Sequence, residues 1–270
     1  MSLILCRQEP VTSPYFIEEL GIHIYSSQEL CYVIYNHPLL VMEDFVDVGL
    51  AEFLRSELRM PFLAERIEKW LDGRGASDEL LFLILQECAY YSPQEQARYR
   101  QAVTNLRKIS VDEYAKRRAD YHYSLGLYGR AISMYEKILD AGKEKHLSGE
   151  FKSRIWNNIA ACYTKLFCFQ KAMYAYDCAW NEKSEKAYLK RMYFLTLMEP
   201  ELEMKDRYKE LIEKEDTCAW DVEAQGSMDE AANSSEVIRL QQLFEKDPIK
   251  RISGAGEIIN DWKYQYRKMI

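Results

Sequence analysis

Glycine and proline are scarce in this chain, which contains 11 glycines and 7 prolines among 270 residues. Turn-rich β proteins need more of both, because tight turns use the positive φ of glycine and the fixed φ of proline. Hydrophobic residues make up 48% of the chain, and tyrosine alone occurs 20 times. That fraction is enough to bury a core, which excludes a wholly disordered chain. The composition therefore predicts an all-α fold.

Long hydrophobic runs are also missing. The first ten residues place no long apolar run after a basic region, and the densest apolar run later in the chain is LLFLIL, from Leu80. It is far too short to cross a bilayer. The seven cysteines show no CxxC pair, which fits a reducing compartment. We therefore expect a soluble, cytoplasmic protein that is not exported and has no membrane partner.

Positive charge is not in excess, since the formal net charge is -7. The acidic residues gather in residues 213–236, where eight of them stand beside a single lysine, so that the remainder of the chain is neutral. Nucleic-acid binding needs clustered basic residues to neutralise phosphates, and we do not expect it here. Because the acidic stretch has few large apolar residues, residues 216–236 are predicted to form an acidic linker or mobile loop.

Sequence motifs of common enzymes are absent as well. The chain has no phosphate-binding glycine-rich loop, no GxSxG and no HExxH, the patterns that mark phosphate, nucleophile and zinc chemistry. Its four histidines are scattered without a metal-ligand spacing. We therefore predict no catalytic residues, no metal and no cofactor. An enzyme whose site forms from residues distant in the sequence stays open as an alternative.

Capping boxes mark the helices of the first 110 residues. Ser92 is followed by Pro93 and Glu95, and Ser110 by Glu113, which satisfies the free amides at a helix start. Between residues 78 and 91 the chain is strongly apolar, and we expect this helix in the middle of the N-terminal half. Near residue 110 the pattern changes from irregular helices to helix pairs. An N-terminal helical region is therefore predicted over 1–110.

Two segments of the middle of the chain repeat a pattern of small and aromatic residues. The first is YHYSLGLYGRAISMYEKIL and the second is ACYTKLFCFQKAMYAYDCAW. Small residues let two helices approach closely, while aromatic residues fill the space between one pair and the next. The matching positions all lie 41 residues apart: Ala119 and Ala160, Tyr128 and Phe169, Ala131 and Ala172, Tyr135 and Tyr176.

This pattern resembles the tetratricopeptide repeat, which is normally 34 residues long. The connection DAGKEKHLSGE accounts for the extra length, and the copies depart from the family at Ala115, His122 and Phe167, where it has Trp, Tyr and Gly. A degenerate third unit begins at EKAYLKRMYFLTLM. The resemblance implies an all-α, right-handed α-α superhelix over 111–215, with additional N-terminal helices. Helices of 237–270 are expected to cap its open end.

In this family the first helix of each repeat lines a groove that holds a peptide. Carried over to this chain, the resemblance implies a groove lined by basic and amide side chains, namely Lys116, Arg117, Arg154, Asn157, Asn158, Lys165, Lys186 and Lys190. Such side chains suit an acidic peptide or a C-terminal carboxylate. We therefore expect a non-catalytic scaffold or adaptor for a protein or peptide partner.

Two hypotheses concern what fills this groove. Some tetratricopeptide domains clamp a terminal carboxylate with Lys, Asn and Arg on successive first helices, and similar places here hold Lys116, Asn158, Lys186 and Lys190. Asp120 departs from that clamp, because its charge would repel a carboxylate. The second hypothesis is that the acidic segment 213–236 occupies the chain's own basic groove.

Other functions stay open beside the scaffold. One alternative is a regulatory receptor that binds a small signalling peptide and acts on an effector, although residues 1–60 show no basic recognition helix. Another is that the repeats only support the protein or join copies of it into a homo-oligomer. The sequence identifies neither the partner nor the pathway, and it leaves the oligomeric state open.

Overall fold

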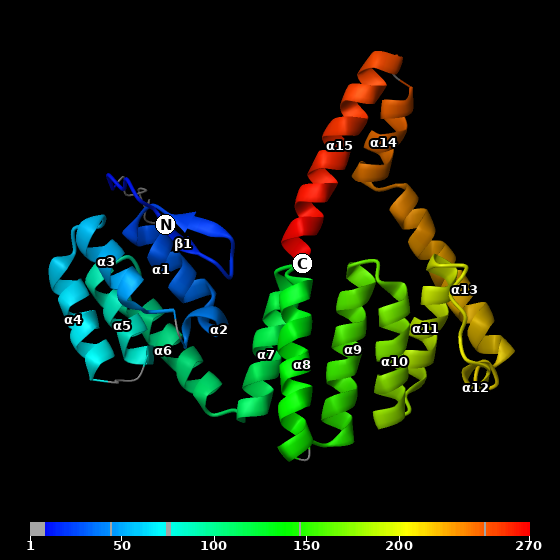
Figure 1. Ribbon diagram of the computed structural model, residues 1–270, viewed down its shortest axis with the longest axis horizontal. Helices are drawn as coiled ribbons and strands as arrows, with labels where there is room; N and C mark the ends of the chain where they lie inside the picture. Colours follow the sequence, from blue (N-terminus) through cyan, green and yellow to red (C-terminus); the bar gives the residue numbers. More distant parts are fainter. Residues whose placement is uncertain (1–8, 44, 74–76, 146, 246) are drawn as a thin grey trace. The chain divides into compact units, whose positions relative to one another are not determined.

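The computed structural model describes residues 9–43, 45–73, 77–145, 147–245 and 247–270. Over these residues the chain is built from helices, with a single two-stranded sheet (Figure 1). The all-α class predicted from the composition is therefore confirmed. The chain divides into two compact units, residues 1–114 and 115–270. The sequence placed its change of pattern near residue 110.

The first unit begins with a β-hairpin that the sequence did not indicate. Strands β1 (Tyr15–Ile17) and β2 (Ile22–Ile24) pair antiparallel, and Gly21 takes a φ of 64° in the turn between them. Three residues are too few to show an alternating pattern. The helices that follow are α1 (Ser27–Asn36), α2 (Pro38–Val41), α3 (Val48–Ser56), α4 (Pro61–Asp72), α5 (Ser77–Cys88) and α6 (Pro93–Arg107).

Helix α5 forms the centre of the first unit. Every side chain from Leu80 to Leu85 is buried, and α5 packs against α1, α4 and α6. An apolar run on all sides of a helix is expected where neighbours cover each face. The sequence prediction of a central helix here is therefore correct. Helix α6 begins at the predicted capping box, in which the Ser92 hydroxyl accepts a hydrogen bond from the Glu95 amide.

The second unit consists of antiparallel helices followed by a C-terminal arm (Figure 1). Helices α8, α9, α10 and α11 pack in chain order. The core of the unit contains fully buried alanines, Ala119, Ala131, Ala160 and Ala172, at the positions that the 41-residue spacing matched. The helices of the unit are α7 (Val111–Ser124), α8 (Tyr128–Lys145), α9 (Gly149–Lys165), α10 (Phe169–Glu182), α11 (Lys186–Met198), α12 (Asp206–Lys209), α13 (Lys214–Ala232), α14 (Ser235–Phe244) and α15 (Pro248–Met269).

The turns α7–α8 and α9–α10 repeat each other bond for bond. The amide of Leu127 donates to the carbonyl of His122 at 3.0 Å, and the amide of Cys168 donates to that of Tyr163 at 2.8 Å. Both pairs close the same helix C-terminal motif, in which the residue before the donor adopts the left-handed conformation. That residue is Gly126 in the first turn, but in the second it is Phe167, with a φ of 58°.

The third helix pair is reduced, because α11 is followed by the single turn α12. The segment predicted as an acidic linker, 216–236, is instead largely the helix α13. Two features order it: a capping box between Glu213 and Asp216, and a buried anchor, Trp220. Helix formers such as Ala and Glu fill most other positions, and a polar composition therefore did not prevent a helix here.

The C-terminal arm of α13, α14 and α15 runs away from α11 and returns to the start of α8 (Figure 1). Met269 packs on the core of the unit, and the Tyr266 hydroxyl lies 3.5 Å from the carbonyl of Leu166. None of the residues of α15 is buried. The sequence expected residues 237–270 to cap the last repeat. The structure instead places α13 against α11, while α15 reaches the α9–α10 turn. No helix of the described residues has the length and apolar character needed to span a bilayer.

Phe167 provides a test of the repeated turn. Its side chain is 70% exposed, and a left-handed conformation costs an L-residue roughly 1–2 kcal/mol relative to glycine. Phe167→Gly should therefore be about 1 kcal/mol more stable than Phe167→Ala, which keeps the strained backbone. Gly126→Ala in the matching turn should lose about 1 kcal/mol. Urea unfolding followed by circular dichroism measures the free energies of unfolding of these variants. Equal stabilities of Phe167→Gly and Phe167→Ala would contradict a left-handed backbone at residue 167.

Candidate functional site

The predicted groove residues lie on α7, α9 and α11, and one carboxylate links the first two of these helices. Asp120 forms an ion pair with Lys116, with 2.6 Å between Nζ of Lys116 and Oδ2 of Asp120. Its other oxygen accepts hydrogen bonds from the Tyr135 hydroxyl at 2.6 Å and from the Asn158 amide at 2.9 Å. Burial raises the pKa of Tyr135, and the hydrogen bond to Asp120 raises it further, so the hydroxyl remains a donor.

This Asp120 network uses two of the four clamp candidates. The Lys116 side chain is only 12% exposed, and Asn158 divides its amide between Asp120 and Tyr135. The sequence analysis expected the negative charge of Asp120 to repel a ligand carboxylate. In the structure, Lys116 and Asn158 bind Asp120 itself. Charge-assisted hydrogen bonds of this kind are among the strong ones. Asn158 and Tyr135 therefore join α9 and α8 to α7 at Asp120, and Lys116 balances the charge of this carboxylate from within α7.

The α9 candidates are spread along the helix. The Asn157 oxygen accepts a hydrogen bond from Arg191 on α11, a residue that the sequence prediction missed. Arg154 lies over the Phe151 ring, with its guanidinium carbon 5.6 Å from the ring centre. Lys165 is exposed at the end of α9, and Arg117 is exposed on α7. The structure therefore groups Asn157 with α11.

The α11 candidates contact the acidic helix α13. Lys186 pairs with Asp216 at 2.7 Å, and Lys190 pairs with Glu223 at 2.5 Å. The ion pair with Lys186 lowers the pKa of Asp216 and raises that of Lys186. These contacts are the ones expected if residues 213–236 occupy part of the basic face.

Two further contacts join the same helices. The Tyr193 hydroxyl donates to Asp221 at 2.6 Å. This hydrogen bond raises the pKa of Tyr193 to about 12, with a smaller contribution from burial. The Trp220 ring lies 5.6 Å from the Tyr193 ring and is 7% exposed. Sequence reasoning missed Trp220 as an anchor, because no local pattern tells an anchoring Trp from any other core aromatic.

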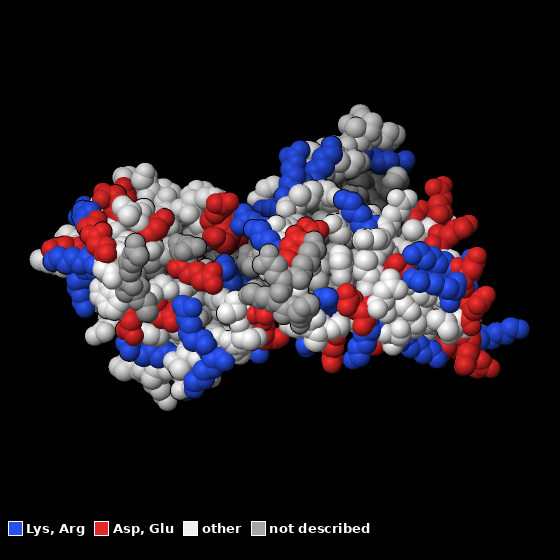
Figure 2. Space-filling view, turned by 60° about the horizontal axis from the view of Figure 1, so that its bottom comes forward, with Lys and Arg blue, Asp and Glu red and all other residues white. Residues whose placement is uncertain are grey.

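All four clamp candidates therefore hold a carboxylate of this chain. Figure 2 shows basic and acidic side chains intermingled at the end of the second unit. The face has the chemistry for carboxylate binding, because ammonium, amide and phenol groups all donate hydrogen bonds. In this state it binds carboxylates from α7 and α13.

A second cluster fixes the chain just before α13. Asp177 on α10 pairs with Lys205 at 2.9 Å and with Arg207 at 2.6 Å, and the Tyr208 hydroxyl donates to it as well. Burial alone would raise the pKa of Asp177, but these partners outweigh it and hold the pKa below its usual value. Asp177 therefore ties α12 to α10. Its partners stand 28 to 31 residues away, so no local motif could reveal them.

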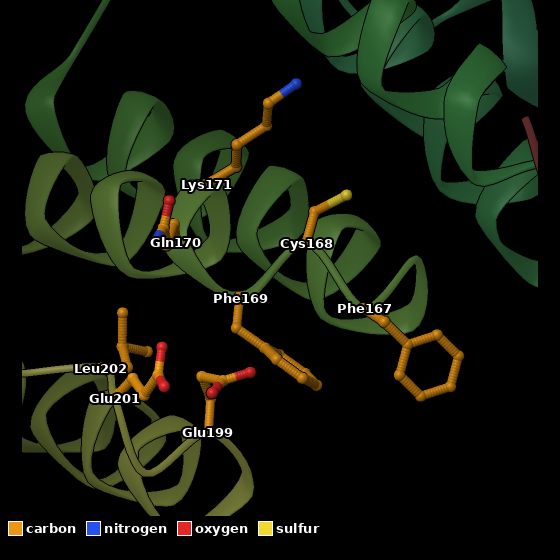
Figure 3. A pocket seen from close by; sticks show the side chains of 8 residues that line it. All are labelled: Phe167, Cys168, Phe169, Gln170, Lys171, Glu199, Glu201 and Leu202. Atoms are coloured by element: carbon orange, nitrogen blue, oxygen red, sulfur yellow. The ribbon is translucent and has the colours of Figure 1, made fainter.

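A pocket of about 380 Å³ opens between the α9–α10 turn and the segment after α11. Figure 3 shows Phe169, Glu199 and Leu202 facing one another across it, while Lys171 points away, toward the Tyr163 ring. The lining residues are Phe167, Cys168, Phe169, Gln170, Lys171, Glu199, Glu201 and Leu202. Within the described part of the chain, no group of three or more His, Cys, Asp or Glu residues could hold a metal ion.

No protein-family model, curated protein or solved structure matches this chain. The resemblance to tetratricopeptide repeats therefore depends on the chain's own residues, namely the 41-residue period and the repeated turn.

Asp177→Asn tests the cluster that positions α12. A carboxylate whose pKa is lowered by folding adds stability above its unfolded pKa of about 4, and this stability is lost as the pH falls through the lower folded pKa. The variant should be about 2 kcal/mol less stable than the wild type at pH 7. The difference should narrow below about pH 4. Thermal unfolding between pH 7 and pH 3 measures the stability difference between the wild type and the variant. A difference that does not change with pH would exclude stabilisation of the fold by the ionised Asp177 carboxylate.

Proposed function

We propose that the second unit is a non-catalytic interaction module, a scaffold or adaptor whose tetratricopeptide-like superhelix binds an acidic segment of a partner protein. One observation carries the proposal: the α11 face, made of Lys186, Lys190 and Tyr193, holds three carboxylates of a helix packed against it. A surface that binds acidic side chains in this way within the chain has the chemistry to bind them from a partner.

The pairs on α11 are exchangeable. The Lys186 and Lys190 side chains are 58% and 31% exposed, and exposed ion pairs contribute only about 0.2–1 kcal/mol each. A partner that supplies equivalent carboxylates therefore replaces them at little cost. The Asp120 network differs, because the Lys116 side chain is nearly buried and shares its carboxylate with two residues of other helices, Tyr135 and Asn158. The binding face proposed here therefore centres on α11 and the neighbouring part of α9.

This geometry favours side-chain carboxylates over a clamp around a single terminal carboxylate. Lys116 and Asn158 would have to leave Asp120 before they could bind a chain terminus. The exposed cations Arg154 and Lys165 extend the positive face along α9 and suit further acidic residues of an extended ligand. The proposal keeps the cytoplasm as the compartment, because seven cysteines without a paired motif favour reducing conditions.

A capture experiment tests the function. The purified chain is immobilised and exposed to lysate of its own host, beside the variant Lys186→Ala/Lys190→Ala. A partner should be retained by the wild type and lost at least tenfold from the variant, since two charge-assisted contacts of about 1 kcal/mol each are removed. The matched control Lys263→Ala/Lys268→Ala removes the same charge from α15 and should retain the partner. Equal retention by all three chains would exclude the α11 face as the binding site.

A further inference from the structure

Helix α13 is attached to the second unit by few contacts. It is 19 residues long, yet Trp220 is its only buried residue. Val222 and Met228 are exposed on its outer side. Segments with few buried contacts open at a low free energy, well below that of global unfolding. Helix α13 can therefore leave the α11 face while α7–α11 stay folded.

The contacts between α11 and α13 form two matching stripes. On α11 the stripe is Lys186, Lys190 and Tyr193, and on α13 it is Asp216, Trp220 and Glu223. Both sets follow the spacing i, i+4, i+7, which places side chains on one face of a helix. This is the arrangement by which a helix recognises a surface through a few anchors. A ligand for α11 is thus a helix with acidic residues one turn before and after an aromatic anchor.

A hollow beside the anchor is left unfilled by α13. It measures about 370 Å³ and is lined by Tyr193, Thr196, Leu202, Glu203, Met204, Lys209, Ile212 and Thr217. Thr217 is the only residue of α13 in this lining, and it stands three positions before Trp220. A larger apolar residue at that position would enter the hollow and displace water from apolar surface. A ligand with such a residue binds more tightly than α13 itself.

We infer that the α11 face receives from its partner an acidic helix with an aromatic anchor and, three residues before the anchor, an apolar residue, and that α13 occupies the face until this helix replaces it. The inference rests on the proposed function and narrows its ligand. It also makes α13 an internal competitor, because a tethered segment competes at an effective concentration in the millimolar range.

Peptides of the chain's own α13, added to the full-length protein, test the inference. The probes are fluorescein-labelled peptides of residues 211–232, one with the natural sequence and one with Thr217→Leu. Fluorescence anisotropy compares the wild type with Trp220→Ala, which removes the anchor of the tethered helix. Both peptides should bind the variant about tenfold or more tightly than the wild type. The Thr217→Leu peptide should bind more tightly than the natural one.

Three further variants control the comparison. Asp216→Lys/Glu223→Lys releases α13 through charge repulsion and keeps Trp220, so it carries the test if Trp220→Ala loses helix content. Val222→Ala changes an exposed residue of α13 and should bind like the wild type. Adding Lys186→Ala/Lys190→Ala to a released chain should remove the peptide affinity, because the complementary charges are gone.

Each outcome separates the inference from the proposed function. If the peptides bind the wild type as tightly as Trp220→Ala and Asp216→Lys/Glu223→Lys, α13 is not a competitor. The proposal that α11 binds an acidic ligand would be unaffected. Binding that persists without Lys186 and Lys190 would overturn the α11 face as the place of docking. If neither peptide binds any chain, the inference is overturned, and the capture experiment alone decides whether another acidic partner uses the face.

Discussion

Close approach of helices at alanine is the constraint on which the second unit depends. Ala119, Ala131, Ala160 and Ala172 are fully buried, so neighbouring backbones come near enough for short polar side chains to meet across them. The Asp120 network is a product of this closeness, because Tyr135 and Asn158 reach one carboxylate from two other helices. A larger side chain at the alanine positions would separate the helices and leave those polar groups buried without partners, a cost above the loss of packing.

Carboxylates bind side chains of neighbouring helices within the second unit, and three cases matter for its function. Asp120 joins α7 to α8 and α9, Asp177 joins α10 to α12, and the acidic residues of α13 join that helix to α11. The three differ in their further partners. Asp120 and Asp177 each also accept a hydrogen bond from a buried tyrosine, Tyr135 or Tyr208, and stabilise the fold. In each α13 ion pair one partner, Lys186 or Glu223, is more than half exposed, and these pairs are exchangeable. The same chemistry therefore serves as structure in two places and as a replaceable contact in the third.

Much of the fold followed from local patterns. The apolar run from Leu80 indicated a central helix, the Ser92 box gave the start of α6, and the 41-residue spacing located the two turns that share their hydrogen bonds. Residues 216–236 were predicted to be a linker or loop, but most of them form the helix α13. The prediction was wrong because an average over polar residues does not show that one buried side chain, Trp220, can hold a helix in place. Trp220 and the capping box at Glu213 order α13 although most of its surface faces solvent.

The sequence by itself determined the helical class, the helix pairs and which basic and amide residues stand on the first helix of each pair. These depend on spacings within a few turns of the chain, where side-chain periodicity and capping act locally. Only the tertiary structure decided that Asn158 binds Asp120 while Lys186 and Lys190 bind α13. Such contacts join residues up to 38 positions apart, and the choice among many possible charged partners is made by how the helices pack.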